Sequence, residues 1–197
     1  MMEEGGKAGW RARLRAARGR LGPADLMAAA AALQTHLLDR LDGAGRVAAY
    51  VPVGREPGSL ELLDAMRDSG TVVLLPVVVP GGLDWVAYAG RAGLVTGALG
   101  TREPTGRRLG AGAIGTADTV LVPALAVDRV GTRLGRGGGY YDRALALTGA
   151  GAVVAALLHD GELVGELPRD PWDRPVSAAV TPGIGWTELP VVEHDGR

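Results

Sequence analysis

The sequence of 197 residues contains no cysteine and no phenylalanine. Without cysteine, disulfides, thiolate nucleophiles and cysteine-ligated zinc are all excluded. The three histidines, His36, His159 and His194, stand far apart and form no metal-binding spacing. Because phenylalanine is missing, aliphatic side chains must fill most of the core.

A large net charge and long apolar runs are missing as well. The formal net charge of -1 gives no electrostatic argument for a nucleic-acid partner. No apolar run approaches the roughly 20 residues that span a bilayer, and the stretch from Thr71 to Val79 is interrupted by Pro76. Met1 to Gly9 lacks the apolar centre of a secretory signal. We therefore expect a cytoplasmic protein that binds neither nucleic acid nor membranes. Separately, we expect a monomer whose partners are small molecules.

The composition is that of a folded globular protein, with 47% hydrophobic and 22% charged residues. The length suits one domain, and neither an internal repeat nor a linker divides it. We expect a single domain over residues 1–197, with loose termini at 1–6 and 187–197.

Helix-like and strand-like segments alternate along the chain. Helices are expected at Lys7–Arg20, Pro23–Leu41, Leu60–Arg67 and Gly139–Leu147, and strands at Arg46–Val53, Thr71–Pro76, Leu83–Tyr88, Thr119–Pro123, Gly151–Leu158 and Ser177–Thr181. This alternation predicts an α/β fold of three layers, with a mostly parallel central sheet flanked by helices. Such a fold is Rossmann-like, as in sugar-phosphate isomerases and CoA transferases. Gly90 to Thr116 has no clear period and is expected to be a long loop, a kind of segment that is often functional.

One segment, from Leu121 to Leu145, has a clear chemical character: LVPALAVDRVGTRLGRGGGYYDRAL. Its three successive glycines, Gly137 to Gly139, let backbone N–H groups approach an anion closely, and the expected helix adds a favourable dipole. Arg133 and Arg136 supply charge-assisted hydrogen bonds to phosphate or carboxylate oxygens. The segment therefore favours phosphate binding.

The residues after the glycines extend this interpretation. Asp142 is placed where a carboxylate beside bound phosphates usually binds Mg²⁺, and Tyr140 and Tyr141 can stack on a heterocycle or hydrogen-bond to it. The segment does not match the Walker A pattern or the dinucleotide-binding GxGxxG pattern. From these residues alone, a glycine-rich turn with solvated arginines remains the alternative.

The run RLGRGGGYYD, with VPALAVD before it, resembles the C-terminal motif of 5-formyltetrahydrofolate cyclo-ligases, approximately VPGLAFDxxGxRLGxGxGYYDRxL. Weaker similarities lie in KAGWR (7–11), YVPVGREP (50–57), REP (102–104) and GELPRDPWDRPVSAAVTP (165–182). The resemblance spans roughly Lys7 to Pro182. No role for the Glu-Pro pair in REP follows from the sequence.

The resemblance implies an ATP- and Mg²⁺-dependent closure of 5-formyltetrahydrofolate to 5,10-methenyltetrahydrofolate, with release of ADP and phosphate. ATP is the co-substrate and Mg²⁺ the cofactor. In this family the formyl oxygen attacks the γ-phosphate, and N10 then displaces the phosphorylated oxygen from the formyl carbon. No protein nucleophile is required, which agrees with a chain that lacks cysteine.

The resemblance also implies site residues. The catalytic residues are Arg136 and Tyr140, and the metal ligands are Asp142 and Asp173. The ATP-binding residues are Lys7, Arg11, Arg133, Leu134, Gly135, Arg136, Gly137, Gly138, Gly139, Tyr140 and Tyr141. The folate-binding residues are Val51, Glu56, Arg136, Gly137, Gly138, Gly139 and Tyr140.

The sequence departs from the family pattern at three places. Val127 replaces phenylalanine, Trp172 stands where many relatives have histidine, and Gly161-Glu162 replaces an aromatic-glutamine pair. Trp172, like Trp85, is expected to be a packing residue. A non-catalytic nucleotide- or folate-binding relative is therefore one alternative. Another is a sugar-phosphate isomerase or CoA transferase on the same scaffold, although the catalytic carboxylate and base of such enzymes are not recognisable here.

Overall fold

The structure is a computed structural model that describes residues 6–97 and 100–190. The expected loose termini fall partly outside this range, at residues 1–5 and 191–197. Within it, Thr187 and Glu188 belong to the last strand, where they pair with Ala179 and Ala178. Leu189 is buried, and its amide donates to the Ser177 carbonyl at 2.9 Å. For residues 187–189 the expectation of a loose end was wrong.

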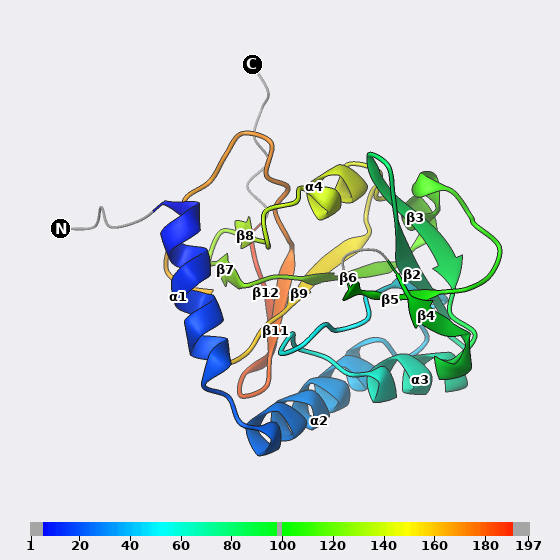
Figure 1. Cartoon of the computed structure of the whole chain (residues 1–197), viewed down its shortest axis with the longest axis horizontal. Coiled ribbons are helices and arrows are strands. Elements are labelled where there is room, and N and C mark those ends of the chain that lie inside the picture. The colour runs from blue at the N-terminus through cyan, green and yellow to red at the C-terminus, as the bar shows by residue number, and fades with distance from the viewer. Residues whose placement is uncertain (1–5, 98–99, 191–197) are drawn as a thin grey trace.

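A seven-stranded sheet in the order β12-β11-β9-β6-β1-β2-β3 forms the middle layer (Figure 1). Its strands are β1 (Arg46–Ala48), β2 (Val72–Val79), β3 (Gly82–Ala87), β6 (Thr119–Pro123), β9 (Val153–Leu157), β11 (Ala178–Thr181) and β12 (Gly185–Glu188). The five inner strands are parallel, and only the edge strands β3 and β12 are antiparallel to their neighbours. The predicted mostly parallel α/β sheet is confirmed.

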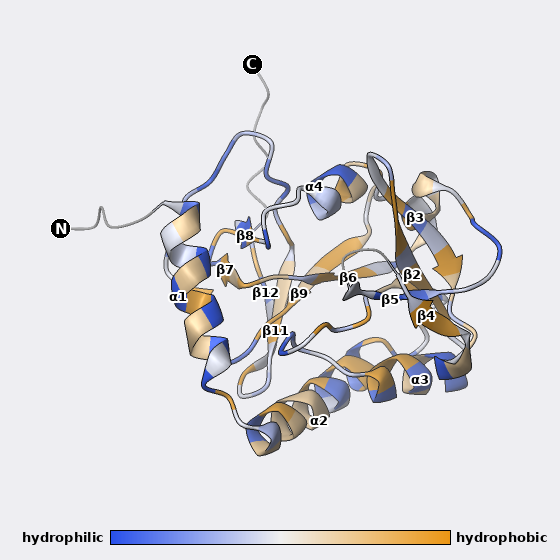
Figure 2. Cartoon of the chain, viewed as in Figure 1, coloured by the Kyte–Doolittle hydropathy of each residue, from blue (hydrophilic) through white to orange (hydrophobic). Residues whose placement is uncertain are grey.

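Helices cover both faces of this sheet because its strands are apolar on both sides. The helices are α1 (Lys7–Gly19), α2 (Pro23–Arg40), α3 (Leu60–Asp68) and α4 (Tyr140–Leu145), with the short 3₁₀ turns η1 (Arg91–Gly93) and η3 (Ala111–Thr116). Val47 and Leu121 belong to the core cluster shared with α2 and α3. Ala48 and Val120 point the other way, into the cluster shared with η3 and α4. Figure 2 shows the apolar strands between these layers.

Two shorter sheets flank the main one. Strands β10 (Leu163–Val164), β7 (Ala126–Asp128) and β8 (Arg133–Leu134) form a small sheet. Helix α1 packs against it through a cluster that includes Leu14, Leu125 and Leu134. The hairpin of β4 (Leu94–Thr96) and β5 (Arg102–Pro104) lies beside β2. Residues 90–97 and 100–116 therefore contain two strands and two 3₁₀ turns, and the expectation of one long loop was wrong.

Two predicted strands differ from the observed ones at the site end of the sheet. Strand β1 stops at Ala48, and after the bond from the Ala49 amide to the Leu74 carbonyl (2.8 Å) the chain leaves the sheet. Strand β2 continues through Pro76 to Val79. Beyond Leu74 it pairs only with β3, so the N–H group that proline lacks is not needed for pairing with β1. No helix within residues 6–97 and 100–190 is long and apolar enough to cross a membrane.

Candidate active site

The topology of the sheet determines where the site lies. From β1 the chain moves to β2 on one side, and it later places β6 on the other side of β1. At such a switch point the loops at the carboxyl ends of the two strands diverge and leave a crevice. A cleft of about 1440 Å³ opens there, lined by Tyr50, Val51 and Glu56 after β1 and by Pro123 and Ala124 at the end of β6. Because a pocket for one small molecule is about 300–1,000 Å³, this cleft has room for two.

The predicted glycine loop forms one wall of the cleft. Gly137 and Gly139 have φ angles of 110° and 65°, a left-handed region that favours glycine. The amides of Gly137, Gly138 and Gly139 donate to no acceptor in the described part of the chain. Successive unpaired N–H groups that line a cleft are suited to binding an anion. Helix α4 follows the loop but has only six residues, fewer than predicted.

Arg136 and Glu56 meet across the cleft. The Arg136 Nη2 lies 2.9 Å from the Glu56 Oε1, and it also donates to the Val53 carbonyl at 3.3 Å. The Glu56 side chain is only 8% exposed, and its other oxygen accepts from the Val53 amide at 2.9 Å. Burial raises the pKa of Glu56 above its ordinary value of 4.5, although the Val53 amide and the Arg136 charge oppose the shift. The structure thus brings these two predicted site residues together.

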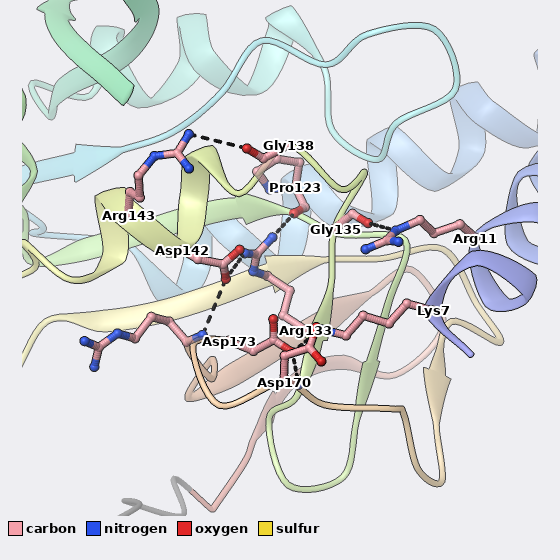
Figure 3. Close-up of polar contacts among 11 residues, drawn as sticks. Lys7, Arg11, Pro123, Arg133, Gly135, Gly138, Asp142, Arg143, Asp170 and Asp173 are labelled. Atoms are coloured by element: carbon pink, nitrogen blue, oxygen red, sulfur yellow. Dashed lines mark hydrogen bonds and ion pairs between the residues drawn. The ribbon is translucent and has the colours of Figure 1, made fainter. Parts of the chain in front are cut away.

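Arg133 and Asp142 form a second ion pair beneath the glycine loop (Figure 3). The Arg133 Nη2 donates to the Asp142 Oδ1 at 2.7 Å, and its Nη1 donates to the Pro123 carbonyl at 3.3 Å. Asp142 also accepts from the Arg174 amide at 3.4 Å. Through this ion pair Arg133 orients the Asp142 carboxylate. Because its side chain is only 4% exposed, Arg133 is less accessible to a ligand than Arg136.

Helix α1 brings two predicted ATP-binding residues to the same place. The Lys7 ammonium forms ion pairs with Asp170 (2.6 Å) and Asp173, and the Arg11 Nε donates to the Gly135 carbonyl at 2.9 Å (Figure 3). Burial lowers the pKa of Lys7, but the hydrogen bonds and charges of the two aspartates outweigh it and leave the pKa raised. Lys7 and Arg11 both line the cleft.

The two predicted metal ligands are both cleft residues, each paired with a cation. Asp142 pairs with Arg133, and Asp173 pairs with Lys7. No group of three histidine, cysteine or acidic side chains able to hold a metal gathers among the described residues. Two hard carboxylates without a protein cage fit Mg²⁺, which is usually bound by one or two carboxylates together with substrate phosphates.

The aromatic residues take different positions. Trp85 is fully buried, as expected. Trp172 is 70% exposed and lines the cleft, so its expected packing role was wrong. Tyr140 and Tyr141 also line the cleft, and the Arg143 guanidinium lies 5.2 Å from the Tyr140 ring. Trp172 and Tyr140 are thus available to a ligand ring.

A buried ion pair behind the cleft was not predicted. Arg18 donates to both carboxylate oxygens of Glu162, at 2.6 and 2.8 Å, and to the Ala124 carbonyl at 2.6 Å. Glu162 also accepts from the His159 amide at 2.8 Å, and the His159 ring donates to the Arg55 carbonyl at 3.0 Å. In the sequence, Arg18 is one of several basic residues in the expected helix Lys7–Arg20, and Glu162 is a departure from the family pattern. Nothing in the sequence indicates that these two residues form an ion pair.

Comparisons with known proteins agree with this geometry. The model of the 5-formyltetrahydrofolate cyclo-ligase family matches residues 3–182. A 5-formyltetrahydrofolate cyclo-ligase of Mycolicibacterium smegmatis is 49% identical over 150 residues, which cover 73% of this chain and 76% of that protein. One of Escherichia coli K12 is 33% identical over 144 residues, covering 71% and 79%.

Solved structures show the same fold. The 5,10-methenyltetrahydrofolate synthetase of Aquifex aeolicus superposes with a TM-score of 0.80 at 27% identity, covering 97% of this chain and 98% of that one. The synthetase of Mycoplasma pneumoniae gives 0.70 at 17% identity, covering 88% and 96%, and supports the fold alone. The glycine motif, the cleft and these matches agree, and the chain belongs to the 5-formyltetrahydrofolate cyclo-ligase family.

Proposed function

We propose that the chain catalyses the ATP- and Mg²⁺-dependent conversion of 5-formyltetrahydrofolate to 5,10-methenyltetrahydrofolate, with release of ADP and phosphate. The observation that carries the proposal is the row of unpaired amides at Gly137 to Gly139 beside Arg136, in a cleft large enough for two substrates. The names of the matched relatives support the same reaction.

ATP binds through its phosphates in this proposal. The three glycine amides and Arg136 hold the terminal phosphates, and Lys7 and Arg11 approach from helix α1. Lys7 exchanges its aspartate partners for phosphate oxygens when the nucleotide enters. Charge-assisted hydrogen bonds of this kind are among the strongest that a protein makes, and they stabilise the charge that moves during phosphoryl transfer.

Asp142 and Asp173 would hold Mg²⁺ beside these phosphates. The ion supplies charge neutralisation to the transferring phosphoryl group. The part played by the chain itself is orientation, because Arg133 holds the Asp142 carboxylate and Lys7 holds that of Asp173. Arg133 therefore acts mainly through Asp142.

The folate lies against Val51, Glu56 and Tyr140 in this proposal. The formyl oxygen bonds to the γ-phosphorus while the bond from phosphorus to the ADP oxygen breaks. N10 then bonds to the formyl carbon, phosphate leaves with the former formyl oxygen, and the N10 proton is lost to solvent. Catalysis rests on holding the two substrates in line, and Arg136 is placed between the folate side and the phosphate side of the cleft.

An absorbance assay tests the reaction. Purified protein, 5-formyltetrahydrofolate and Mg²⁺ should give the absorbance of the methenyl product only after ATP is added, in proportion to enzyme concentration. A non-catalytic binding relative would bind nucleotide without this signal. Absence of the signal at saturating substrates, in protein that binds ATP, would overturn the proposal.

A further inference from the structure

The Glu-Pro pair at residues 103 and 104 includes one residue of the cleft, Glu103. It belongs to β5, beside the site end of β2. Glu103 lines the cleft together with Pro76, Val78 and Leu83 from β2 and β3. Glu103 is itself only 8% exposed. This part of the cleft therefore combines apolar walls, one buried carboxylate and the exposed guanidinium group of Arg102.

Only one oxygen of the Glu103 carboxylate accepts hydrogen bonds from the described residues. Its Oε1 accepts from the Val78 amide and from the Thr101 hydroxyl, both at 3.2 Å. A side chain at Gly97 would begin 2.1 Å from the Glu103 carboxyl carbon, so glycine is required there. The Glu103 Oε2 accepts from no described residue. A carboxylate can accept about four hydrogen bonds, and the unused half of this capacity belongs to the oxygen without a partner.

Because Glu103 lines the cleft, a ligand there can supply hydrogen-bond donors to its unused oxygen. The apolar side chains of Pro76, Val78 and Leu83 suit the face of a ring, and the Glu103 charge disfavours a phosphate or a folate carboxylate at its own position. The aminopyrimidinone edge of the pterin presents a ring N–H and an exocyclic amine side by side. The amine of adenine is instead flanked by acceptor nitrogens, which a carboxylate repels.

We propose that Glu103 binds the aminopyrimidinone edge of the pterin through its Oε2 and so selects the folate substrate. The assignment rests on the proposed function of the cleft. Glu56 then lies toward the reacting end of the same ligand, and Glu103 toward its far edge. The buried carboxylate has a recognition role as well as its contacts within the hairpin.

The test is a pair of binding measurements on the full chain. The Glu103→Gln side chain keeps its size, but its amide group can accept only through one atom and donates through the other. We expect its Kd for 5-formyltetrahydrofolate, measured by calorimetry without nucleotide, to rise about 10-fold to 100-fold, as for loss of a hydrogen bond to a charged group. The Kd for a non-hydrolysable ATP analogue should stay within about twofold, and Glu61→Gln, an exposed glutamate outside the cleft, is the matched control.

Three results would overturn the assignment. The first is an unchanged Kd for 5-formyltetrahydrofolate. The second is a lower Kd for it, which would place the anionic tail of folate beside Glu103. The third is a higher Kd for the ATP analogue with an unchanged Kd for folate, which would place adenine there. If Glu103→Gln does not fold, Glu103→Asp is measured instead. Its shorter side chain keeps the charge but moves the carboxylate away from the ligand, so the Kd for folate should also rise. Failure of the wild-type absorbance assay would instead refute the proposed reaction, so the two failures are distinguishable.

Discussion

Arg136 of the glycine loop and Glu56 of the loop after β1 form a 2.9 Å ion pair across the cleft. The Arg136 side chain is 53% exposed, whereas that of Glu56 is 8% exposed. The arginine can therefore turn toward a ligand while the glutamate stays in place. This pair links the wall proposed to hold phosphate to the wall proposed to hold folate.

Replacement of Arg136 by alanine should reduce kcat/KM for the cyclisation by about 10²-fold to 10³-fold, the usual effect of removing one transition-state donor. The melting temperature should change little, because the arginine is half exposed. Steady-state kinetics and thermal unfolding measure the two effects. Arg129→Ala, an exposed arginine outside the cleft, is the control, and near-normal turnover in Arg136→Ala would refute the role of Arg136.

Glu56 should give stability a pH dependence of a defined sign. Because burial raises its pKa above 4.5 in the folded protein, the folded state holds this proton more firmly than the unfolded state. The contribution of Glu56 to folding stability is therefore greatest at low pH, and it falls as the pH rises through the raised pKa. The melting temperature of wild type minus that of Glu56→Gln should decrease between about pH 4 and about pH 7.

Glu61 offers a comparison of opposite sign for that measurement. A backbone hydrogen bond and Arg91 lower the pKa of this exposed carboxyl. The melting temperature of wild type minus that of Glu61→Gln should therefore increase with pH. The increase should be small because solvent screens the ion pair. If the Glu56→Gln difference were flat or rose with pH, the stated environment of Glu56 would be incorrect.

Lys7→Met should raise the KM for ATP about tenfold or more and leave the KM for 5-formyltetrahydrofolate within about twofold, since the ammonium contributes charge-assisted bonds to phosphate only. Titration of each substrate at saturating levels of the other separates these effects. Arg13→Ala is a control on the same helix, because Arg13 is exposed and stacks on Trp10 away from the cleft. Equal changes in both KM values would count against a nucleotide-specific role.

The Arg18–Glu162 pair should contribute strongly to folding. Removing one partner of a buried pair typically costs about 3–5 kcal/mol, because the other charge is left unpaired. Glu162→Ala should therefore lower the free energy of unfolding by about that amount in urea titrations. Glu188→Ala, which breaks the exposed 3.7 Å pair with Arg40, should cost at most about 1 kcal/mol. Similar losses for the two variants would contradict the buried-pair account.

The sequence predicted the parts of the fold that local patterns determine. The inner strands, such as Thr119–Pro123, were recognisable because a buried parallel strand is continuously apolar. The glycine loop was recognisable because it needs residues without Cβ and carries its arginines within a few positions. Both features depend on neighbours in the chain.

What could not be predicted depends on distant residues. Lys7 meets Asp170 and Asp173, and Arg18 meets Glu162, only because α1 packs across the small sheet. The strands of that sheet have two or three residues, too few for a periodic signal. The role suggested for Glu103 likewise needed the position of β2.

The central claim is that the amides of Gly137, Gly138 and Gly139, together with Arg136, bind the phosphates of ATP. A crystal structure with a non-hydrolysable ATP analogue and Mg²⁺ tests it most directly. The account predicts phosphate oxygens within about 3.2 Å of these N–H groups, with Lys7 moved from Asp173 toward the nucleotide. A nucleotide bound elsewhere in the cleft, with the glycine amides facing only solvent, would contradict it.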